Sequence, residues 1–490
     1  MDITFQKAKN GETTALIGNL YLHSAYNPQR EAERFVDNLQ NPFCPKIVII
    51  TEPGIAYVKN YLRKKFPESK IGIIRYIRGF EEYNKGFDFV INYFENSNNF
   101  DNFLLQFFGE ETLLETFFCK WDVSSKIFPE IDIKVWHSIK NVLENAKTLL
   151  ITRQYFEKKW LTNTFNFIRY LKNPLLLKNN INFPLLIIAS GSSLRAFLPI
   201  IKQNQSKFFI IVLSSAIKVC IDNGIKADLA LSTDGGYWAG QHLKSLYKNT
   251  LVLGGSPESF IPKKILNKNP ILPLLYSDGL SKEICNLCNL PGNKAERNGT
   301  ISGTALDFGL SFFTNDIFIC GLDLANCKGF QHTQINELEL NSLIKDDRVS
   351  SKEKRAVKSQ FSKSSLEIYK NWFENKEIGH RKVYRLIEDT ESQNKLGMIK
   401  DLNSSSFISF CDSLNSISKE NMFIKSNFTY NKEVLIHYLN AEFQSEKCKR
   451  QLYPLEFVLL SHNQHNNDVK ERIENNHKKL YKKLWGIIND

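Results

Sequence analysis

The sequence predicts an α/β protein with a central doubly wound, Rossmann-like domain, an N-terminal α/β domain and a C-terminal helical region. Short apolar runs alternate with helical patterns, which is typical of parallel strands covered by helices on both faces. The plan of strand, turn, helix and strand occurs twice, at residues 46–77 and 185–215, and this indicates two such domains. The expected boundaries are 1–130 for an N-terminal α/β domain, 131–180 for a helical linker, 181–400 for the central domain and 401–490 for a C-terminal helical region.

The linker and the second half of the central domain follow from the same patterns. Residues 135–171 have helical apolar spacing with few helix breakers, so we expect helices that bridge the two α/β domains. A helix after the second repeat should end at Gly224, which suits the position just past a helix end. Further strands are expected at 227–233, 250–256, 271–277 and 316–321, and a helix with a polar start at 300–313.

Composition limits the class of protein. Hydrophobic residues make up 42% of the 490 residues and charged residues 24%, as in soluble globular proteins. The first residues have no apolar core, and no apolar stretch approaches the length of a membrane span. We therefore expect a cytoplasmic protein without a membrane span. Nine cysteines are scattered, and the close pair Cys285 and Cys288 lacks a matching second pair. Reduced thiols are therefore favoured over a zinc site.

The net charge of +12 lies partly in basic tracts such as residues 345–365. Such charge could attract nucleic acid or an acidic partner. The sequence contains no nucleic-acid-binding motif beside it, so we interpret the charge as a solvated, lysine-rich surface and expect no nucleic-acid partner.

The turn after the apolar run at 185–189 is a candidate ligand site. Small residues from Ser190 to Ser193 lead into a helical pattern, and Ser192 or Ser193 could cap that helix. The free N–H groups of a helix start attract phosphate, and Gly191 would let a ligand approach the backbone closely. The alternative is an ordinary strand-to-helix turn, because one glycine is not the dinucleotide fingerprint.

Polar residues follow three other predicted strands of the central domain. These residues are Asp234, Ser256 and Asp323. Because the carboxyl ends of parallel strands share one edge, and ligands of doubly wound sheets bind beyond that edge, we expect these residues to meet the turn at 190–193. The residues by themselves thus indicate a nucleotide-like ligand at the carboxyl edge of the sheet.

Four segments between Pro184 and about Lys400 resemble a bacterial family, the motility-associated factor glycosyltransferases, which share a domain with MptE-like 6-hydroxymethylpterin diphosphokinases. The segments are IIASGSSL, NGIKADLALSTDGG, NGTISGTALDFGLSF and IFICGLDLANCKGFQH. Their order and spacing together carry the resemblance, and Ser192 and Ala227 stand where the family usually has proline. The N-terminal stretch GNLYLHSAYNPQREAERFV is also similar to the opening of the motility-factor branch.

The resemblance implies a central domain similar to bacterial sialyltransferases. It implies transfer of a nonulosonic acid, such as pseudaminic or legionaminic acid, from a CMP-activated donor. The acceptors would be serine or threonine hydroxyls of flagellin or another protein.

Such a reaction needs groups that hold the donor. Backbone N–H groups of the turn at 190–193 can hold the phosphate. Asp234 corresponds to the strand-end acid that binds ribose hydroxyls, although it could instead only cap a turn. Neutral donors at the helix start near residue 300 can stabilise the negative charge that leaves with the nucleotide. The expected donor-binding residues are Ser190, Gly191, Ser192, Ser193, Asp234, Ser256, Asn298, Gly299, Thr300 and Ser302.

The reaction also needs a base for the acceptor hydroxyl. His332 has a suitable intrinsic pKa, although it could be a plain loop histidine. Asp323 lies nine residues earlier, and a nearby carboxylate would raise the pKa of the imidazole and fix its tautomer. We therefore expect Asp323 and His332 to be the catalytic residues. In an alternative arrangement Asp323 holds a metal while His332 contacts the donor phosphate.

Two other functions stay open. A pterin diphosphokinase would use ATP with Mg²⁺ held by Asp234 and Asp323, but the ~180 residues before the shared domain and ~90 after it exceed what a small pterin needs. A non-catalytic flagellar assembly or binding protein could keep the same fold, because fold does not fix function.

Overall fold

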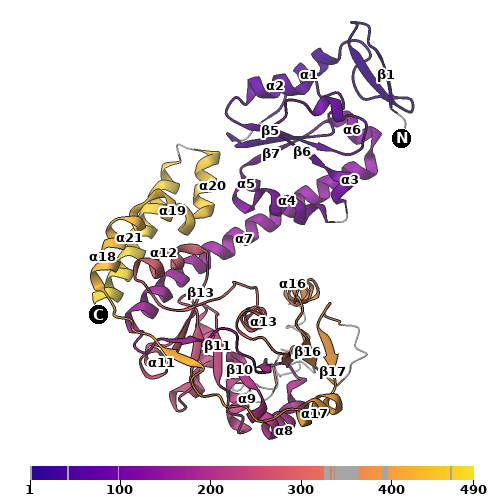
Figure 1. Cartoon of the computed structure of the whole chain (residues 1–490). Helices are drawn as coiled ribbons and strands as arrows, with labels where there is room; N and C mark the ends of the chain where they lie inside the picture. The colour runs from indigo at the N-terminus through magenta and orange to yellow at the C-terminus, as the bar shows by residue number, and fades with distance from the viewer. Residues whose placement is uncertain are drawn as a thin grey trace, which may run out of the picture. The chain divides into compact units, whose positions relative to one another are not determined.

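The computed structural model describes residues 3–40, 43–97, 99–324, 332–333, 336, 363–388, 395–463 and 466–489. They form two compact units: unit 1 comprises 1–157 and 445–479, and unit 2 comprises 158–444 and 480–490 (Figure 1). The chain passes between the units three times: within the long helix α7 (Pro129–Tyr170), between residues 444 and 445, and within the long helix α21 (Asn467–Asn489). The region expected at 401–490 as one helical segment is therefore divided between both units.

Unit 1 is built on a parallel sheet of four strands in the order β6-β5-β4-β7. The apolar, mostly β-branched sequence IVIIT forms the buried strand β4, as expected for a strand covered on both faces. The first strand–helix–strand repeat of the sequence corresponds to β4, α2 and β5. The bounds are β4 (Ile47–Thr51), α2 (Val58–Lys65), β5 (Lys70–Arg75), β6 (Phe89–Asn92) and β7 (Thr116–Lys120).

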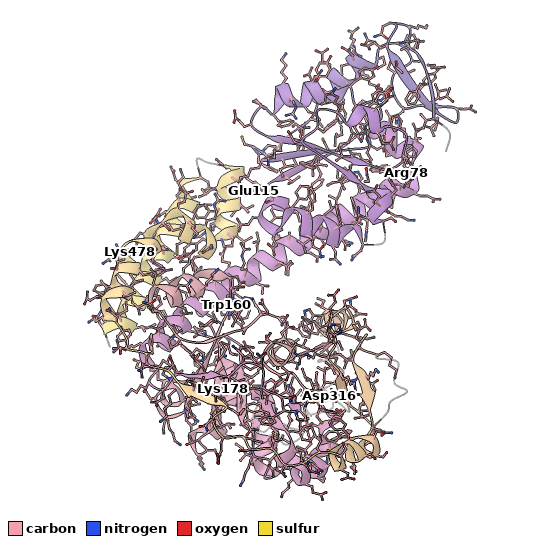
Figure 2. The ribbon with its side chains drawn as sticks, viewed as in Figure 1. Arg78, Glu115, Trp160, Lys178, Asp316 and Lys478 are labelled. Carbon is pink, nitrogen blue, oxygen red and sulfur yellow. The ribbon has the colours of Figure 1, made fainter. Side chains whose placement is uncertain are left out.

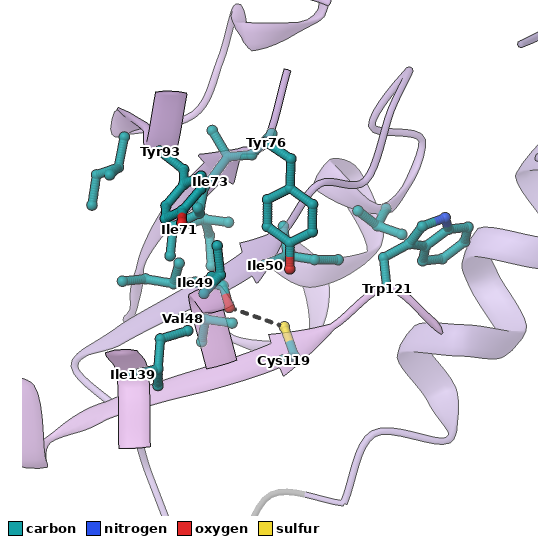
Figure 3. Close-up of a cluster of buried hydrophobic side chains, with 14 of the residues drawn as sticks. Val48, Ile49, Ile50, Ile71, Ile73, Tyr76, Tyr93, Cys119, Trp121 and Ile139 are labelled. Atoms are coloured by element: carbon teal, nitrogen blue, oxygen red, sulfur yellow. Dashed lines mark hydrogen bonds between the residues drawn. The ribbon is translucent and has the colours of Figure 1, made fainter. Parts of the chain in front are cut away.

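The core of unit 1 combines aliphatic side chains of this sheet with buried aromatic rings (Figure 3). Val48, Ile50 and Ile71 have no exposed surface, and Tyr76 and Trp121 are almost completely buried. A small antiparallel sheet and one helix precede β4. They are β1 (Ile3–Lys7), β2 (Thr13–Ile17), β3 (Leu20–Tyr21) and α1 (Pro28–Asp37).

A buried ion pair lies at the carboxyl ends of β4 and β5. The guanidinium of Arg75 donates to the Glu52 carboxylate at 2.8 Å, and the backbone N–H of Tyr76 donates to the same carboxylate at 2.6 Å. Nearby, the N–H of Ile55 donates to the ring of His23 at 2.9 Å, and burial lowers the pKa of His23 to about 3. At this edge of the smaller sheet the Glu52 carboxylate is thus paired with groups of the protein itself.

Unit 2 contains a parallel sheet of nine strands in the order β14-β13-β12-β11-β10-β9-β15-β16-β17. The sequence patterns predict β9 to β13 and β15, whereas β14, β16 and β17 were not predicted, because their sequences NK, VYRL and KDL contain no continuous apolar run. The bounds are β9 (Leu185–Ile188), β10 (Phe209–Leu213), β11 (Leu229–Ser232), β12 (Leu253–Gly255), β13 (Ile271–Leu275), β14 (Asn293–Lys294), β15 (Ile317–Cys320), β16 (Val383–Leu386) and β17 (Lys400–Leu402).

Helices connect these strands. Gly224 has a φ of +70°, so the predicted helix end after α9 is formed by a left-handed glycine. The helices of unit 2 that matter below are α8 (Leu194–Asn204), α9 (Ile217–Asp222), α10 (Tyr237–His242), α13 (Ile301–Phe312) and α16 (Lys363–Glu374). No helix in the described part of the chain combines the length and apolar character needed to cross a bilayer.

Candidate functional site

The strand order of the large sheet reverses at β9. From β9 the chain adds β10 to β14 in sequence on one side, and after α13 it places β15 on the other side of β9. Doubly wound sheets bind ligands beyond the carboxyl ends of their strands at such a reversal. The turn after β9, residues 189–193, and the loop after β15, residues 321–324, meet at this point.

Asp323 lies directly against the turn after β9. Its carboxylate accepts a hydrogen bond from the Ser192 hydroxyl at 2.9 Å, one from the Ser193 backbone N–H at 2.8 Å and one from the Ser193 hydroxyl. The expected side-chain cap on α8 is therefore wrong, because both hydroxyls donate to Asp323 instead of accepting from the helix. The anion at the start of α8 is a carboxylate of the protein, and it already uses one N–H group that we expected to hold the donor phosphate.

Gly191 is required by the protein's own packing. A Cβ at this position would lie 2.5 Å from the Gly321 carbonyl oxygen and 2.7 Å from the Asp323 carboxyl carbon. The Gly191 N–H also donates to that carbonyl at 2.9 Å. The close approach expected for a ligand is thus made by the loop after β15.

We expect Gly191→Ala to destabilise unit 2 by about 1–3 kcal/mol, the usual cost of overpacking, because backbone and carboxylate must both move. The change should appear as a lower midpoint in urea unfolding followed by circular dichroism. Gly486→Ala is the matched control, since a Cβ there meets no atom within 4 Å. Equal stability of the two variants would contradict this interpretation of the turn.

The described residues of the segment after β15 lie on the same turn. The Thr333 N–H donates to the Ser190 carbonyl at 2.5 Å, and the Thr333 hydroxyl donates to the Gly191 carbonyl. The side-chain amide of Asn336 donates to the Ser215 carbonyl, after β10, at 3.0 Å. Because Thr333 is fixed in this way, its neighbour His332 is placed at the carboxyl edge beside the turn that carries Gly191.

A second histidine, His242 at the end of α10, lies beside His332 with 6.1 Å between the ring centroids. Burial, and to a lesser degree His242, lowers the pKa of His332 to about 4. The expectation that Asp323 raises this pKa is wrong, because the pKa is lowered, and its causes are burial and His242. His332 is therefore uncharged at neutral pH, which is the protonation state that a base needs.

His242 is a site residue that the sequence reading missed. Burial lowers its pKa, and the negative charge of Asp234 partly opposes this effect. Asp234, His242 and His332 thus interact in series across two loops. The only local sequence signal for His242 is its position. It stands at the end of a short helix that begins just after the strand-end acid Asp234.

Asp234 is exposed beyond the end of β11. Its carboxylate accepts a hydrogen bond from the Gly236 N–H at 2.8 Å, so it does cap a turn, as one sequence alternative held. The loop is braced from α7, where the Asn163 side chain donates to the carbonyls of Gly235, at 3.1 Å, and Glu258, at 2.8 Å. Asp234 is therefore held in one place with a carboxylate that solvent or a ligand can reach.

The start of α13 is largely occupied by contacts within the protein. The Thr300 hydroxyl caps the helix by accepting from the Gly303 N–H at 3.0 Å, and the Asn298 amide donates to Asp307 at 2.7 Å. Ser302 is half-buried in the first turn. The Thr300 hydroxyl accepts in this cap and keeps its own hydrogen for donation, whereas the Asn298 amide uses one of its two hydrogens within the protein.

Two glycines near this helix start accept aromatic rings of α16. A Cβ at Gly299 would lie 3.1 Å from the Tyr369 ring, and one at Gly303 would lie 3.3 Å from the Trp372 ring. Ring packing thus accounts for Gly299, whereas Gly303 is also crowded by Asn298, whose Cβ would lie 3.1 Å from an added Cβ.

Ser256 does not reach the surface. It is completely buried after β12, and both the N–H of Ser259, at 2.9 Å, and its hydroxyl, at 2.5 Å, donate to the Ser256 carbonyl. The expectation that Ser256 contacts the donor is therefore not supported by its position. Within the described ranges, no group of three or more His, Cys, Asp or Glu side chains is placed to hold a metal ion. Asp234 and Asp323 therefore belong to no such group among these residues.

Arg297 forms a cluster that no sequence motif indicated. Its guanidinium lies 4.8 Å from the ring centre of Trp160 on α7 (Figure 2) and 4.6 Å from that of Tyr276. It donates to the buried Glu258 carboxylate at 2.5 and 2.8 Å and to Asp278 at 3.2 Å. The cluster connects the loops after β12 and β13 to α7, and so holds these loops in place at the carboxyl edge of the sheet.

An open pocket of about 410 Å³ lies elsewhere in unit 2, between α13 and the segment that leads into β16. This segment precedes the amino end of β16, so the pocket is not at the edge where the strand-end residues meet. None of the expected site residues lines it. Its titratable lining residues are Glu296, Asp307, Lys376, Glu377, His380 and Arg381.

The comparisons with known proteins first define the class. Residues 158–329 match the family described as 6-hydroxymethylpterin diphosphokinase MptE-like, so the chain carries an MptE-like domain, which forms most of the large sheet of unit 2. An uncharacterized protein of Treponema pallidum (strain Nichols) is 28% identical over 286 residues, which are 57% of this chain and 61% of that protein. The chain thus matches about three fifths of the length of this relative.

The fold of the chain is similar to that of a motility-associated factor glycosyltransferase. The structure of MAf glycosyltransferase from Magnetospirillum magneticum AMB-1 aligns with a TM-score of 0.52 and 12% identity, covering 99% of this chain and 90% of that chain. The family resemblance seen in the sequence is thereby confirmed for the MptE-like domain and for the fold.

Proposed function

We propose that this protein is a glycosyltransferase that moves a nonulosonic acid of the pseudaminic or legionaminic type from a CMP-activated donor to serine or threonine hydroxyls of flagellin. The observation that carries the proposal is the extent of the fold correspondence, 99% of this chain and 90% of the MAf glycosyltransferase. It includes unit 1 and the C-terminal helices, which lie outside the MptE-like residues 158–329. Such additional domains suit a protein acceptor better than a small pterin.

The geometry gives each reacting group a candidate partner. The exposed carboxylate of Asp234 can accept hydrogen bonds from ribose hydroxyls. His332, uncharged at neutral pH, takes the proton while the acceptor oxygen attacks the anomeric carbon of the sugar. The bond from that carbon to the phosphate oxygen breaks, and CMP leaves with the electron pair. Asp323 acts as a positioning residue, because it holds the turn to which Thr333 is hydrogen-bonded. His332 is the neighbour of Thr333 and is placed by the same contact.

A second candidate function follows from the family match alone. The MptE-like description names a pterin diphosphokinase, whose chemistry transfers diphosphate from ATP with Mg²⁺ held by carboxylates. Calorimetric titration of the purified protein separates the candidates: CMP and CMP-activated nonulosonic acid should bind without added Mg²⁺. Binding of ATP with Mg²⁺ and 6-hydroxymethylpterin, and of no CMP compound, would favour the kinase.

In the source bacterium, we expect deletion of the gene to lower the intact mass of flagellin by the mass of one or more nonulosonic acid residues and to reduce motility. Mass spectrometry of purified flagellin gives the readout. Complementation with the unchanged gene should restore the mass, whereas complementation with His332→Ala should not. Unchanged flagellin mass with missing filaments would instead indicate an assembly or binding protein.

A further inference from the structure

Two large aromatic side chains are exposed at the carboxyl edge of the large sheet. Tyr237 is 61% exposed and Trp238 is 64% exposed, at the start of the short helix α10. Their rings contact each other edge to face, with 5.6 Å between the centroids. Tryptophan side chains are usually well buried, so an adjacent exposed pair needs an explanation beyond packing.

The pair is held on a braced loop. The ring of Phe260 lies 6.0 Å from that of Tyr237 and packs under the helix at Gly240, where a Cβ would be 2.6 Å from it. The Phe260 N–H also donates to the Asp234 carbonyl at 2.9 Å. The aromatic pair and the Asp234 carboxylate therefore share one fixed support, and little ordering would be needed when a ligand binds.

We propose that the ring of Trp238, which Tyr237 contacts edge to face, is the stacking surface for the nucleobase of the donor nucleotide. The inference rests on the proposed function, in which Asp234 binds the ribose. Base and ribose are covalently joined, so a base must lie within a few ångströms of the acid that holds its ribose. The aromatic pair follows that acid by three and four residues on the same braced loop. Base–aromatic stacking depends on the flat face of the ring and needs no further polar partner.

The test uses Trp238→Ala in the full-length protein, with affinity measured by calorimetry. We expect CMP to bind roughly ten-fold or more weakly, within the range that one base–aromatic stack usually contributes. Ribose 5-phosphate lacks the base, so its affinity should be unchanged by the substitution. Trp238→Phe, which keeps a flat ring, should restore most of the CMP affinity.

Trp485→Ala is the matched control. Trp485 is also an exposed tryptophan, 38% accessible and stacked on Tyr481 at 5.9 Å, but it lies on α21. Its loss should leave CMP affinity unchanged. Circular dichroism melting of each variant checks that the fold is retained.

The outcomes separate the two proposals. If the wild-type protein binds no CMP compound, the proposed function is wrong, and the proposed stacking surface is wrong with it. If unchanged protein binds CMP and Trp238→Ala binds it equally well, only the stacking surface is overturned. A raised KM for the protein acceptor with unchanged CMP affinity would assign the pair to the acceptor and likewise overturn this inference.

Discussion

His332→Ala is expected to lower the turnover of glycosyl transfer by about 100-fold, the usual contribution of a positioned base. The imidazole lies beside the turn at the strand-order reversal, and its lowered pKa keeps it uncharged at neutral pH. Transfer from a CMP-activated donor to flagellin, followed as CMP release, gives the measurement. His137→Ala on the exposed face of α7 is the control and should keep full turnover.

The pH dependence gives a second readout for His332. With a pKa of about 4, its protonation should reduce turnover only below about pH 5, so the rate should be flat through pH 6.5.

The same lowered pKa makes the free energy of unfolding depend on pH. As pH falls from 6.5 to 4, the unfolded chain binds a proton at this residue and the native chain does not. Stability is lost over that window, and His332→Ala should reduce the loss. Full turnover in His332→Ala would exclude the residue as the base.

Asp323→Asn is expected to lower the free energy of unfolding by about 2–4 kcal/mol, because charge-assisted hydrogen bonds to Ser192 and Ser193 are lost together. Turnover should fall by about 100-fold as well, since the turn that seats Thr333 and His332 shifts. Urea unfolding and the CMP-release assay report the two effects. The sequence predicted Asp323 as a catalytic residue that orients His332 and contributes little to stability, whereas in the structure its carboxylate is bonded to the turn after β9.

Asp316→Asn is the control for this substitution. Asp316 directly precedes β15, at the end of the strand opposite to Asp323. Its change should alter stability by less than about 0.5 kcal/mol, as for most surface substitutions, and should leave turnover unchanged. If Asp323→Asn were as stable as Asp316→Asn, the hydrogen bonds at the turn would not hold the two loops together.

The fold class could be predicted from the sequence because its signals are local. Continuous apolar runs identify β4 and β9, helical spacing identifies α8 and α13, and Gly224 marks a helix end. Since parallel strands place their carboxyl ends at one edge, the sequence also predicted that the strand-end residues would meet there. The division into units was different, because two long helices each contribute to both units.

Only the tertiary structure decided what the small and polar residues contact. Ser192 and Asp323 are 131 residues apart, and they meet because β15 is placed beside β9. The same strand order explains why Gly191 serves the protein's own loop. Arg297 with Trp160 and His242 with His332 are likewise distant in sequence. A local sequence pattern indicates the period of a strand or helix, but it does not indicate which strands become neighbours. The order of the strands in the sheet determines which side chains meet at its carboxyl edge, and therefore the chemistry there.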